Sequence, residues 1–463
     1  MNGTGSAAGA APAPFARMAA FIASASPPPS ARTRAATAVL DTIGVTLAGV
    51  TEPASQVVRS QLASSGNSGC VVWGTGLRST APDAALANGT AAHALDYDDM
   101  CFVSLAHPSA PLVPAAIATA ERTGGSGRAV LDAYVVGFEI EARLGRLMNP
   151  RHYQHGWHCT STLGAIGAAA AASRLLGLHT DAAGHSLAIA ASQASGLKEN
   201  FGSMVKPLHA GLAARNGVFA AALAGGGMTG SSHALDGGQG FLHAFDSERD
   251  DLAREALDLG DRWEILDTGI TIKLYPSCAG THPALDALLD LQAREQFTAE
   301  DVDRVEVDVD SIVPTILLYD RPTTALEAKF SMPFCAAAAI VFNGVGIDTF
   351  EDAVIHDARV TSLMPKVTMR ADPAIGKGGP PLTEARVRVS LKSGRSFSQA
   401  AHGARGYPER PASDAALHAK FAACATRVLS PSHAEKAFGL LRRFEELADV
   451  RELTSVLSPQ RGS

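Results

Sequence analysis

The first half of the chain repeats apolar positions with the period of α-helices. Between about residues 32 and 260, helix-length segments rich in alanine follow one another, separated by glycine or proline and with little strand-like alternation. One segment, residues 162–177, carries small residues on nearly every face, which lets neighbouring helices approach it closely on all sides. The pattern predicts a helical bundle with this segment as a central helix.

The pattern changes after residue 260. Val305, Val307 and Val309 alternate with acidic residues, which is the period of a half-buried strand. Residues 385–391 and 395–400 flank a Lys-Ser-Gly turn and read as two antiparallel strands. Helical patterns at 283–296 and 325–342 complete an α+β unit, and residues 413–457 return to helical periodicity.

The length of the chain predicts more than one hydrophobic core. It has 463 residues, of which 46% are apolar, and this exceeds what a single core usually organises. Chain ends often lie close together, so the last helical segment is expected to rejoin the first bundle. We predict a mostly α protein with an α+β second domain. A large all-helical domain is formed by both chain ends (12–265 and 405–463), and 266–404 form a smaller α+β lid domain.

Net charge and cysteine content indicate which classes of partner are excluded and which cellular compartment is expected. A formal net charge of -7 opposes nonspecific attraction to nucleic acid or to an anionic membrane, so neither is an expected partner. No segment reaches the roughly 20 apolar residues that span a bilayer, and the N-terminus lacks the pattern of a secretory signal. The six cysteines are scattered without a CxxC pair, which is typical of reduced thiols. A cytoplasmic location is therefore expected.

The first cluster of candidate reactive residues is HALDYDD, residues 93–99, followed by His107 in a proline-bounded loop. If a helix runs into the cluster, His93 and Asp96 share a face. A loop of this kind can hold an imidazole at the mouth of a cavity. The alternative is a divalent-metal hydrolase, because histidine and aspartate also ligate zinc or manganese; its ligands would be His93, Asp96, Asp98, Asp99 and His107. Since no HxxxH or similar ligand spacing is present, a proton-handling or structural role is favoured.

The second cluster, residues 155–162, stands directly before the alanine-rich helix. Thr160, Ser161 or Thr162 could cap that helix, whose N-terminal amides would then favour an anion beside His158. The alternative is that Trp157 and His158 simply fill the space below the helix.

Two further segments contribute cations. Pro207 suits the first turn of a helix, so Lys206 is expected at a helix start, where a cation is disfavoured unless it meets an anion; an ordinary exposed lysine is the alternative. Lys273, Cys278 and His282 lie where the helical half gives way to the α+β half, and pockets prefer such boundaries. Cys278 suggests a nucleophile, but a packed thiol is the favoured interpretation.

Taken together, these motifs resemble the MmgE/PrpD family. HALDYDD, AHPSAPLVPAA, GWHCTSTLGAIGAAAAASRLLGL, MVKPLHAGLAARNG and IKLYPSCAGTHPALD occur in the family's order, over nearly the whole chain. The family includes 2-methylcitrate dehydratases of propionate metabolism, cis-aconitate decarboxylases and iminodisuccinate epimerases. The resemblance implies a helical domain built from both chain ends with a smaller α+β lid. It also implies a homodimer without metal or organic cofactor.

The resemblance also assigns site residues and shows departures. The family's site residues fall on Asp96, His107, His158, Lys206 and Lys273. Met100 stands where the mammalian decarboxylases have a threonine, and Cys278 stands where they have a histidine. Phe334 stands where they have a tyrosine in the lid. These departures argue against mammalian-type decarboxylation, although fungal decarboxylases are more similar around GWHC, MVK and IKLY.

We therefore expect a cofactor-independent lyase that transfers a proton at carbon of a small di- or tricarboxylic acid. The favoured activity is a 2-methylcitrate or citrate-type dehydratase, with cis-aconitate decarboxylation and iminodisuccinate epimerisation as alternatives within the family. The basic groups Lys206 and Lys273 would hold carboxylates, His107 and His158 would exchange the proton, and Asp96 would orient a ring. Cys278 and His282 are kept as substrate-binding candidates. A noncatalytic carboxylate-binding protein is the third alternative.

Overall fold

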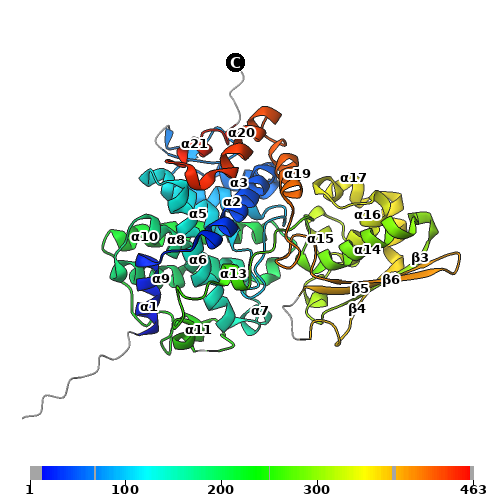
Figure 1. The fold of residues 1–463 in the computed structure, drawn as a ribbon, viewed down its shortest axis with the longest axis horizontal. Helices are drawn as coiled ribbons and strands as arrows, with labels where there is room; N and C mark the ends of the chain where they lie inside the picture. The colour runs from blue at the N-terminus through cyan, green and yellow to red at the C-terminus, as the bar shows by residue number, and fades with distance from the viewer. Residues whose placement is uncertain (1–12, 67–68, 250, 378–381, 459–463) are drawn as a thin grey trace, which may run out of the picture.

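The chain folds into a large helical part and a smaller part built on one sheet (Figure 1). The structure, a computed structural model, describes residues 13–66, 69–249, 251–377 and 382–458. Its mostly helical character, with a small mixed sheet in a second unit, confirms the predicted fold class. The exact boundaries at 265/266 and 404/405 remain a prediction.

The helical part is a bundle of helices from the first half of the chain. Its longer helices are α1 (Pro14–Ser24), α2 (Pro29–Gly49), α3 (Pro53–Ser60), α4 (Ala81–His93), α5 (Ser109–Thr123), α6 (Gly127–Met148), α8 (Cys159–Leu175), α9 (Thr180–Gln193) and α10 (Val205–Gly225). Its single-turn helices are α7 (Arg151–Gln154), α11 (Phe241–Ala244), α12 (Leu252–Glu255) and α13 (Glu264–Asp267). A two-stranded ribbon, β1 (Cys70–Val71) with β2 (Arg78–Ser79), precedes α4.

The alanine-rich helix α8 lies at the centre of the bundle, as predicted. Its residues from Cys159 to Ser173 are buried, and α5, α6, α9 and α10 pack around it. Small residues make this close packing feasible, because a Cβ on Gly217 of α10 would clash with Ala168 of α8. The predicted cap at residues 160–162 was wrong by a few residues: the helix begins at Cys159, and His158 occupies the N-cap position without a side-chain capping bond.

Helices from the C-terminal end return to the bundle. Helices α19 (Asp414–Ala425), α20 (Pro431–Arg442) and α21 (Arg451–Thr454) lie beside α2 and α3 in Figure 1, and both α19 and α20 contact α2. A buried ion pair joins the two ends, with Lys420 Nζ 2.6 Å from Asp41 Oδ1. Both ends of the chain therefore build the helical part.

The smaller part is organised by a four-stranded sheet in the order β4-β3-β5-β6. Its strands are β3 (Val302–Val309), β4 (Val367–Ala371), β5 (Glu384–Leu391) and β6 (Ser396–His402). The pair β3 and β4 is parallel, and the other pairs are antiparallel. The valines of β3 are buried while the intervening residues are more exposed, which confirms the predicted alternation. The predicted hairpin is also confirmed, with Gly394 in the left-handed region at φ 85°.

Helices cover one face of this sheet. The helix α14 (His282–Glu295) packs against β5 and β6, and α16 (Met332–Phe342) packs against β4 and α14 (Figure 1). The helix predicted at 325–342 is instead two helices, α15 (Ala325–Ala328) and α16, separated by Lys329 to Ser331. Proline at 333 disfavours a continuous helix, and Ser331 caps α16 by accepting a bond from the Phe334 amide.

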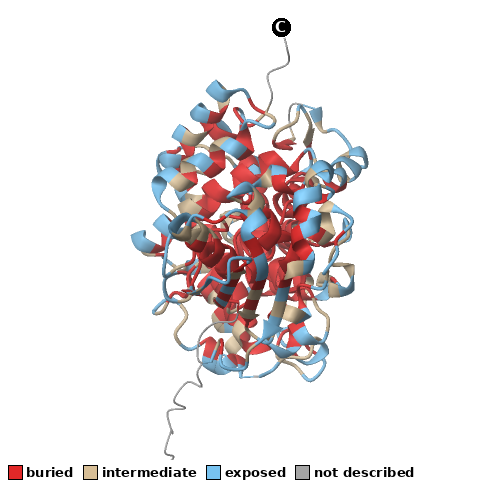
Figure 2. Ribbon diagram, turned by 90° about the vertical axis from the view of Figure 1, so that its right-hand side faces the viewer, coloured by how far each residue is buried: buried red, intermediate tan, exposed pale blue. Residues whose placement is uncertain are grey.

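Smaller helical segments fill the remaining connections of the second part. They are α17 (Asp352–Ile355), α18 (Ala358–Leu363) and the 3-10 turns at Ala279–Thr281, Ala299–Asp301, Val313–Thr315, Ile347–Phe350 and Met364–Lys366. Figure 2 shows the buried residues concentrated in the interior of the molecule. All six cysteines are buried and unpaired, as predicted for reduced thiols. Among the described helices, none has the length and apolarity needed to cross a membrane.

Candidate active site

A pocket lies between the helical part and the smaller part. The helical part contributes Asp96, Met100, Leu105, His107, Tyr153, His158, Phe201 and Lys206 to its wall, and the smaller part contributes Cys278, Ala279, Ile316, Phe330 and Leu382. Five of the site residues predicted from the sequence therefore line one cavity: Asp96, His107, His158, Lys206 and Cys278.

The loop after α4 places the first cluster. The helix ends at His93, so the expectation that His93 and Asp96 share a helical face was wrong. Asp96 instead takes the left-handed conformation at φ 51°, which is uncommon for a residue other than glycine and sharply turns the chain. His93 Nδ1 lies 2.7 Å from Asp98 Oδ2, and both side chains are fully buried.

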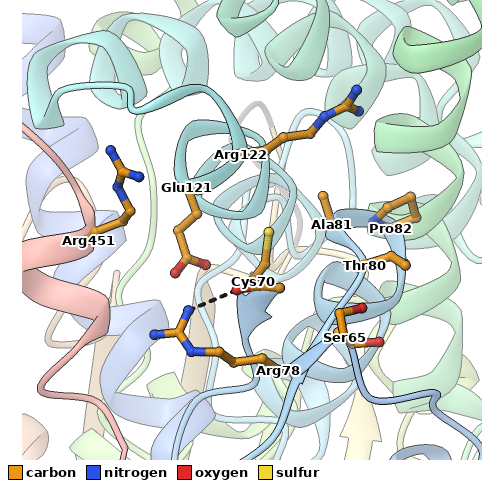
Figure 3. A pocket seen from close by; sticks show the side chains of 11 residues that line it. Ser65, Cys70, Arg78, Thr80, Ala81, Pro82, Glu121, Arg122 and Arg451 are labelled. Atoms are coloured by element: carbon orange, nitrogen blue, oxygen red, sulfur yellow. Dashed lines mark hydrogen bonds between the residues drawn. The ribbon is translucent and has the colours of Figure 1, made fainter. Parts of the chain in front are cut away.

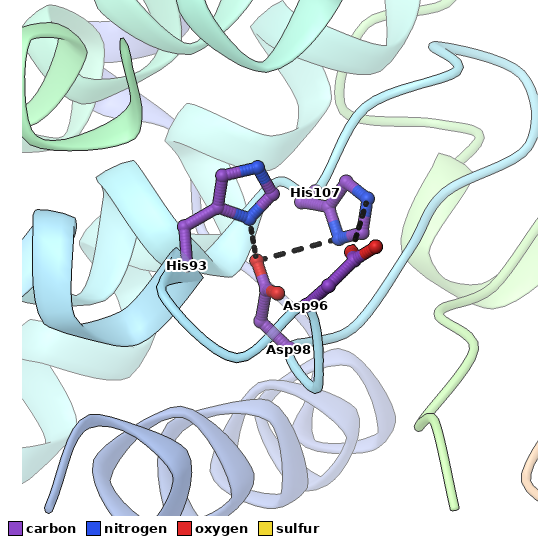
Figure 4. A group of neighbouring side chains, drawn as sticks. All are labelled: His93, Asp96, Asp98 and His107. Atoms are coloured by element: carbon purple, nitrogen blue, oxygen red, sulfur yellow. Dashed lines mark hydrogen bonds and ion pairs between the residues drawn. The ribbon is translucent and has the colours of Figure 1, made fainter. Parts of the chain in front are cut away.

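His107 faces two carboxylates of this loop (Figure 4). Its Nδ1 lies 3.3 Å from Asp98 Oδ2, and its Nε2 lies 3.6 Å from Asp96 Oδ1. The backbone amide of His107 donates to Thr160 Oγ1 at 3.0 Å, which ties this loop to the start of α8. His107 is therefore held between the side chains of Asp96 and Asp98, on the lining of the pocket.

Two ammonium groups neutralise Asp96. Lys273 Nζ and Lys206 Nζ lie 3.0 and 3.2 Å from its Oδ1 atom. Burial alone would raise the pKa of Asp96, but these two lysines hold the pKa well below its ordinary value. Lys273 is fully buried and is not among the described residues of the pocket wall, so it acts on the pocket through Asp96.

Three lysines hold three consecutive carbonyl oxygens of the same loop. Lys329 Nζ donates to the Leu95 oxygen at 2.7 Å, Lys273 Nζ donates to that of Asp96, and Lys420 Nζ donates to that of Tyr97 at 2.9 Å. Each lysine is buried, and burial lowers the pKa of Lys329 to about 8. We call Lys273, Lys329 and Lys420 the lysine clamp; it fixes the backbone that carries Asp96.

His158 is surrounded by other imidazoles and by Lys206. Its Nδ1 lies 3.0 Å from Nδ1 of His209 on α10, and its ring stacks on that of His93 with centroids 5.6 Å apart. Burial holds the pKa of His158 well below its ordinary value, and the neighbouring His93 and Lys206 add to this shift. The ring is therefore neutral near pH 7.

Lys206 lies in the first turn of α10, as predicted, but it is buried rather than exposed. Its Nζ stands 5.4 and 5.2 Å from the ring centroids of Phe201 and Phe330, which provide favourable cation–π surroundings. Within the described part of the chain, this Nζ forms an ion pair with Asp96 but no well-directed hydrogen bond. Its donors remain available to a ligand.

The structure places Cys278 and His282 in different surroundings. Cys278 lines the pocket, and burial, with the charge of Asp96, raises the pKa of its thiol to about 11, which favours the packed-thiol interpretation. His282 is absent from the described pocket wall: its Nε2 lies 3.1 Å from the Ser277 carbonyl oxygen, and its ring packs edge-on against Tyr275. Phe334 is likewise in the core, against Phe350, while Met100 lines the pocket.

Asp99 turns away from the other acidic residues of its loop. Its carboxylate accepts bonds from the amide of Ser109, at 3.2 Å, and from the Ser109 hydroxyl, at the start of α5. Burial raises the pKa of Asp99 to about 8, and Asp41 and Asp98 add to the rise. Asp99 thus supports α5 rather than joining a metal-ligand set.

The residues that could hold a cation are His93, Asp96, Asp98 and His107. One ligand atom from each lies within 4.8 Å of the others, in the part of the chain that the structure describes (Figure 4). The Oδ1 atom of Asp96, however, already faces two ammonium groups, which would repel a divalent ion. The charge pattern around Asp96 therefore disfavours a divalent metal centre.

Comparison with protein families assigns most of the chain to two known domains. Residues 13–252 match the MmgE/PrpD N-terminal domain, and residues 275–445 match the MmgE/PrpD C-terminal domain. The chain belongs to the MmgE/PrpD family. The residues of the pocket come from both matched segments, so the site depends on the complete pair of family domains.

Relatives of this MmgE/PrpD protein include mammalian and fungal enzymes. It is 30% identical to a cis-aconitate decarboxylase of Homo sapiens over 90% of this chain and 88% of the relative, and 29% identical to that of Mus musculus over 90% and 87%. A cis-aconitate decarboxylase of Aspergillus terreus is 27% identical over 92% and 91%. Overall identity thus does not set the fungal relatives above the mammalian ones.

Three residues around this MmgE/PrpD site were missed from the sequence: His209, Lys329 and Lys420. His209 stands in the quoted motif MVKPLHAG, three residues after Lys206, and that spacing could have placed both on one face of α10. Lys329 and Lys420 carried no signal, because their partners at Leu95 and Tyr97 are 234 and 323 residues away.

A second pocket lies elsewhere on the helical part, around the start of α4. Figure 3 shows Arg78, Arg122 and Arg451 around it, together with Glu121 and Cys70. Arg78 donates to the Gly69 carbonyl oxygen at 2.8 Å, and Arg451 is paired with Asp449. None of the site residues predicted from the sequence is among the described residues of this wall.

Proposed function

We propose that this MmgE/PrpD protein is a cofactor-independent lyase that moves a proton at carbon in a small di- or tricarboxylate, and that its reaction is the dehydration of a citrate or 2-methylcitrate-type acid. The observation that carries the proposal is the presence of two imidazoles, His107 and His158, with one ammonium group, Lys206, on a single pocket wall. An elimination of water needs both a base and an acid, and the two histidines have contrasting surroundings suited to these roles.

Substrate binding is proposed to begin at Lys206. Its Nζ has donors available, and a carboxylate placed there would receive charge-assisted hydrogen bonds in buried surroundings. The positive charge also stabilises the negative charge that develops on the substrate when a proton leaves carbon. The apolar residues Leu105, Ile316 and Phe330 also line this pocket.

The two histidines divide the proton transfers. Neutral His158 removes the proton from the carbon beside a carboxylate, and the electrons of that C–H bond form the new double bond. His107, which lies beside Asp96 and Asp98, gives a proton to the hydroxyl group as the C–O bond breaks. The products are an unsaturated acid and water, and the proton count balances.

Decarboxylation of a cis-aconitate-type acid is the second candidate. It is favoured by the names of the mammalian and fungal relatives. In this reaction the bond to one carboxylate breaks, carbon dioxide leaves, and an imidazolium protonates the allylic carbanion. The same pocket can supply the single proton that this reaction needs.

The deciding experiment is incubation of the protein with 2-methylcitrate, citrate, cis-aconitate and iminodisuccinate in separate tubes. Alkene absorbance, released carbon dioxide and optical rotation report dehydration, decarboxylation and epimerisation respectively. Turnover of an acid in one tube, lost in a Lys206→Met variant, supports the proposal. Binding without turnover in every tube would instead indicate a noncatalytic carboxylate-binding protein.

Treatment with a chelator distinguishes a metal-dependent hydrolase from the proposed lyase. Activity that disappears after treatment with EDTA and returns with zinc or manganese would support the His93, Asp96, Asp98 and His107 group as a metal site and contradict the lysine-neutralised mechanism. The homodimer implied by the family resemblance is proposed on that basis alone, and light scattering during gel filtration tests it.

A further inference from the structure

Two buried histidines share one hydrogen bond behind the pocket wall. Nδ1 of His158, at the N-cap of α8, lies 3.0 Å from Nδ1 of His209 on α10. The two ring centroids are 5.3 Å apart, and both side chains are almost completely buried. His158 lines the pocket, whereas His209 is not among the described residues that do.

This contact determines how many hydrogens lie between the rings. Two lone pairs at 3.0 Å would repel each other, and two N–H groups would clash, so one nitrogen donates and the other accepts. Burial, with the charge of Lys206, lowers the pKa of His209 to about 4, and the pKa of His158 is also held low. Both rings are neutral near pH 7, which leaves two tautomeric arrangements for the pair.

One of these arrangements fits both stages of proton transfer. A base at His158 needs an unprotonated Nε2, so its single hydrogen must be on Nδ1. After the ring takes a proton, Nδ1 still carries a hydrogen and must still donate. In both stages, His209 Nδ1 has to be the acceptor. The opposite arrangement would place the hydrogen of His158 on Nε2 and block the base.

We propose that His209 is a positioning residue whose Nδ1 accepts a hydrogen bond from His158 and holds His158 in the tautomer with a free Nε2. Its importance for turnover rests on the proposed function, whereas the tautomer itself does not. His209 occupies the place that a carboxylate takes in many acid/base pairs, but it carries no charge. It orients His158 without stabilising the imidazolium as a carboxylate would.

The ionisable side chains around His158 all lower its pKa further. They are His93 at the end of α4, His107 in the following loop, and Lys206 and His209 on α10. The carboxylates of Asp96 and Asp98, in the loop after α4, are engaged by His107, His93 and the lysines. His158 is therefore surrounded by groups that keep it neutral, which matches the role of the base.

Nuclear magnetic resonance of the full-length protein with ¹⁵N-labelled histidine tests the assignment without substrate. Nitrogen shifts distinguish the two neutral tautomers, and the signals are assigned with His158→Asn and His209→Asn variants. We expect His158 with hydrogen on Nδ1 and His209 with hydrogen on Nε2 at pH 7.5. A spectrum with His158 carrying its hydrogen on Nε2 would overturn the proposal.

Kinetics of three His209 variants test its role in turnover. His209→Leu removes the acceptor and is expected to lower kcat by roughly 10- to 100-fold with a smaller change in KM. In His209→Asn the amide oxygen can take the place of Nδ1, so most of the kcat should be retained. His209→Asp supplies a carboxylate that stabilises protonated His158, so the acidic limb of the pH-rate profile should move upward by about one unit or more.

A matched control is His152→Asn. His152 is also buried, with ring nitrogens 2.6 Å from the Phe245 carbonyl oxygen and 2.8 Å from Thr162 Oγ1, and it lies off the pocket. This variant should lose stability without moving the pH profile. Equal pH profiles for wild type, His209→Leu and His209→Asp would contradict the proposal. If the wild type turns over none of the acids while the spectrum shows the expected tautomers, the proposed function fails and the tautomer assignment stands.

Discussion

At the scale of single residues, the pocket brings ionisable groups together whose surroundings drive them toward different protonation states. Asp96 is held ionised by Lys206 and Lys273, whereas Asp99, three residues later, is held protonated by burial. The contrast follows from the partners that each side chain meets, since both carboxylates are fully buried. Protonation in this loop is therefore set by local neighbours.

The protonation of Asp99 predicts a pH-dependent gain in stability for Asp99→Asn. Its pKa is about 8 in the folded state and near 4 in the unfolded chain, so the wild-type fold retains a proton that the unfolded chain releases between these values. Raising the pH across this window destabilises the wild type relative to the variant by about 1.4 kcal/mol per pH unit. Urea unfolding at pH 5, 6, 7 and 8 measures this difference. A difference that stays constant with pH would show that Asp99 is ionised in the fold.

The raised pKa of Cys278 predicts an unreactive thiol. With a pKa of about 11, almost no thiolate is present at pH 8, so iodoacetamide should modify the native residue far more slowly than the same residue in urea. Cys278→Ser should keep kcat within about tenfold, because a nucleophile would cost much more than that when removed. Mass spectrometry of the modified peptide and steady-state kinetics check the two statements; rapid native labelling with loss of turnover would restore the nucleophile interpretation.

Local sequence patterns were sufficient to find the pocket residues that stand in motifs. Asp96, His107, His158, Lys206 and Cys278 all lie in short segments rich in ionisable residues, proline or glycine, and the structure places them on one wall. The partner of each residue could not be predicted, because partners such as Lys273 for Asp96 come from remote segments. For the same reason the sequence could not separate His282, which is in the core, from Cys278, which lines the pocket.

At the scale of elements, close helix packing determines where the reactive side chains stand. The helix α10 carries both Lys206 and His209 and packs against α4 and α8, whose ends carry His93 and His158. Small residues at these crossings set the distances between the helices. A substitution that changes this helix packing should therefore alter kcat as well as the stability of the fold.

We expect Gly211→Ala to show this coupling. A Cβ at this position of α10 would clash with Thr90 Oγ1 and the Leu86 oxygen of α4, so the helices must separate. Overpacking of this kind costs roughly 1–3 kcal/mol, and kcat should fall because α10 shifts relative to α8. Thermal unfolding and kinetics measure both effects.

The matched control for this substitution is Gly439→Ala on α20. A Cβ there meets no atom within 4 Å, and the position is exposed and far from the pocket residues. Alanine has the higher helix propensity, so this variant should be stabilised by about 0.5–1 kcal/mol with unchanged kinetics. Equal losses in both variants would mean that helix separation is not the cause.

Regular elements were predictable from periodicity, and their interruptions were less so. The alternation around Val307 and the glycine turn at Gly394 identified β3, β5 and β6 because side-chain burial repeats every two residues in a strand. The end of α4 at His93 and the positive φ of Asp96 were missed, since the lysines that hold this loop are remote in sequence. The break between α15 and α16 was readable in principle from Pro333.

At the scale of the whole molecule, the pocket is closed by two parts of the chain. A ligand that contacts both should bind the folded state alone and raise its stability, by about 2.7 kcal/mol at a concentration 100 times its Kd. We predict that a saturated tricarboxylate such as tricarballylate raises the Tm of the wild type. The Lys206→Met variant should show a much smaller rise, while simple sodium chloride at equal ionic strength controls for screening.

Hydrogen exchange locates this effect. Protection should increase in segments around Phe201 and Lys206 and around Ile316 and Phe330, which line the pocket from the two parts of the chain. A rise in Tm with protection confined to the arginine-bordered pocket of Figure 3 would place the anion at that pocket instead.

The lysine clamp has a consequence for how the protein is made. The loop at residues 95–97 leaves the ribosome early, whereas Lys273, Lys329 and Lys420 follow after about 180 to 320 further residues, as the 177, 234 and 323 residue separations require. Until then the acidic turn lacks these three lysines, and Lys206, the other counter-ion of Asp96, is made before them. Catalytic competence must therefore be acquired late in synthesis, when the last of these ammonium groups arrives.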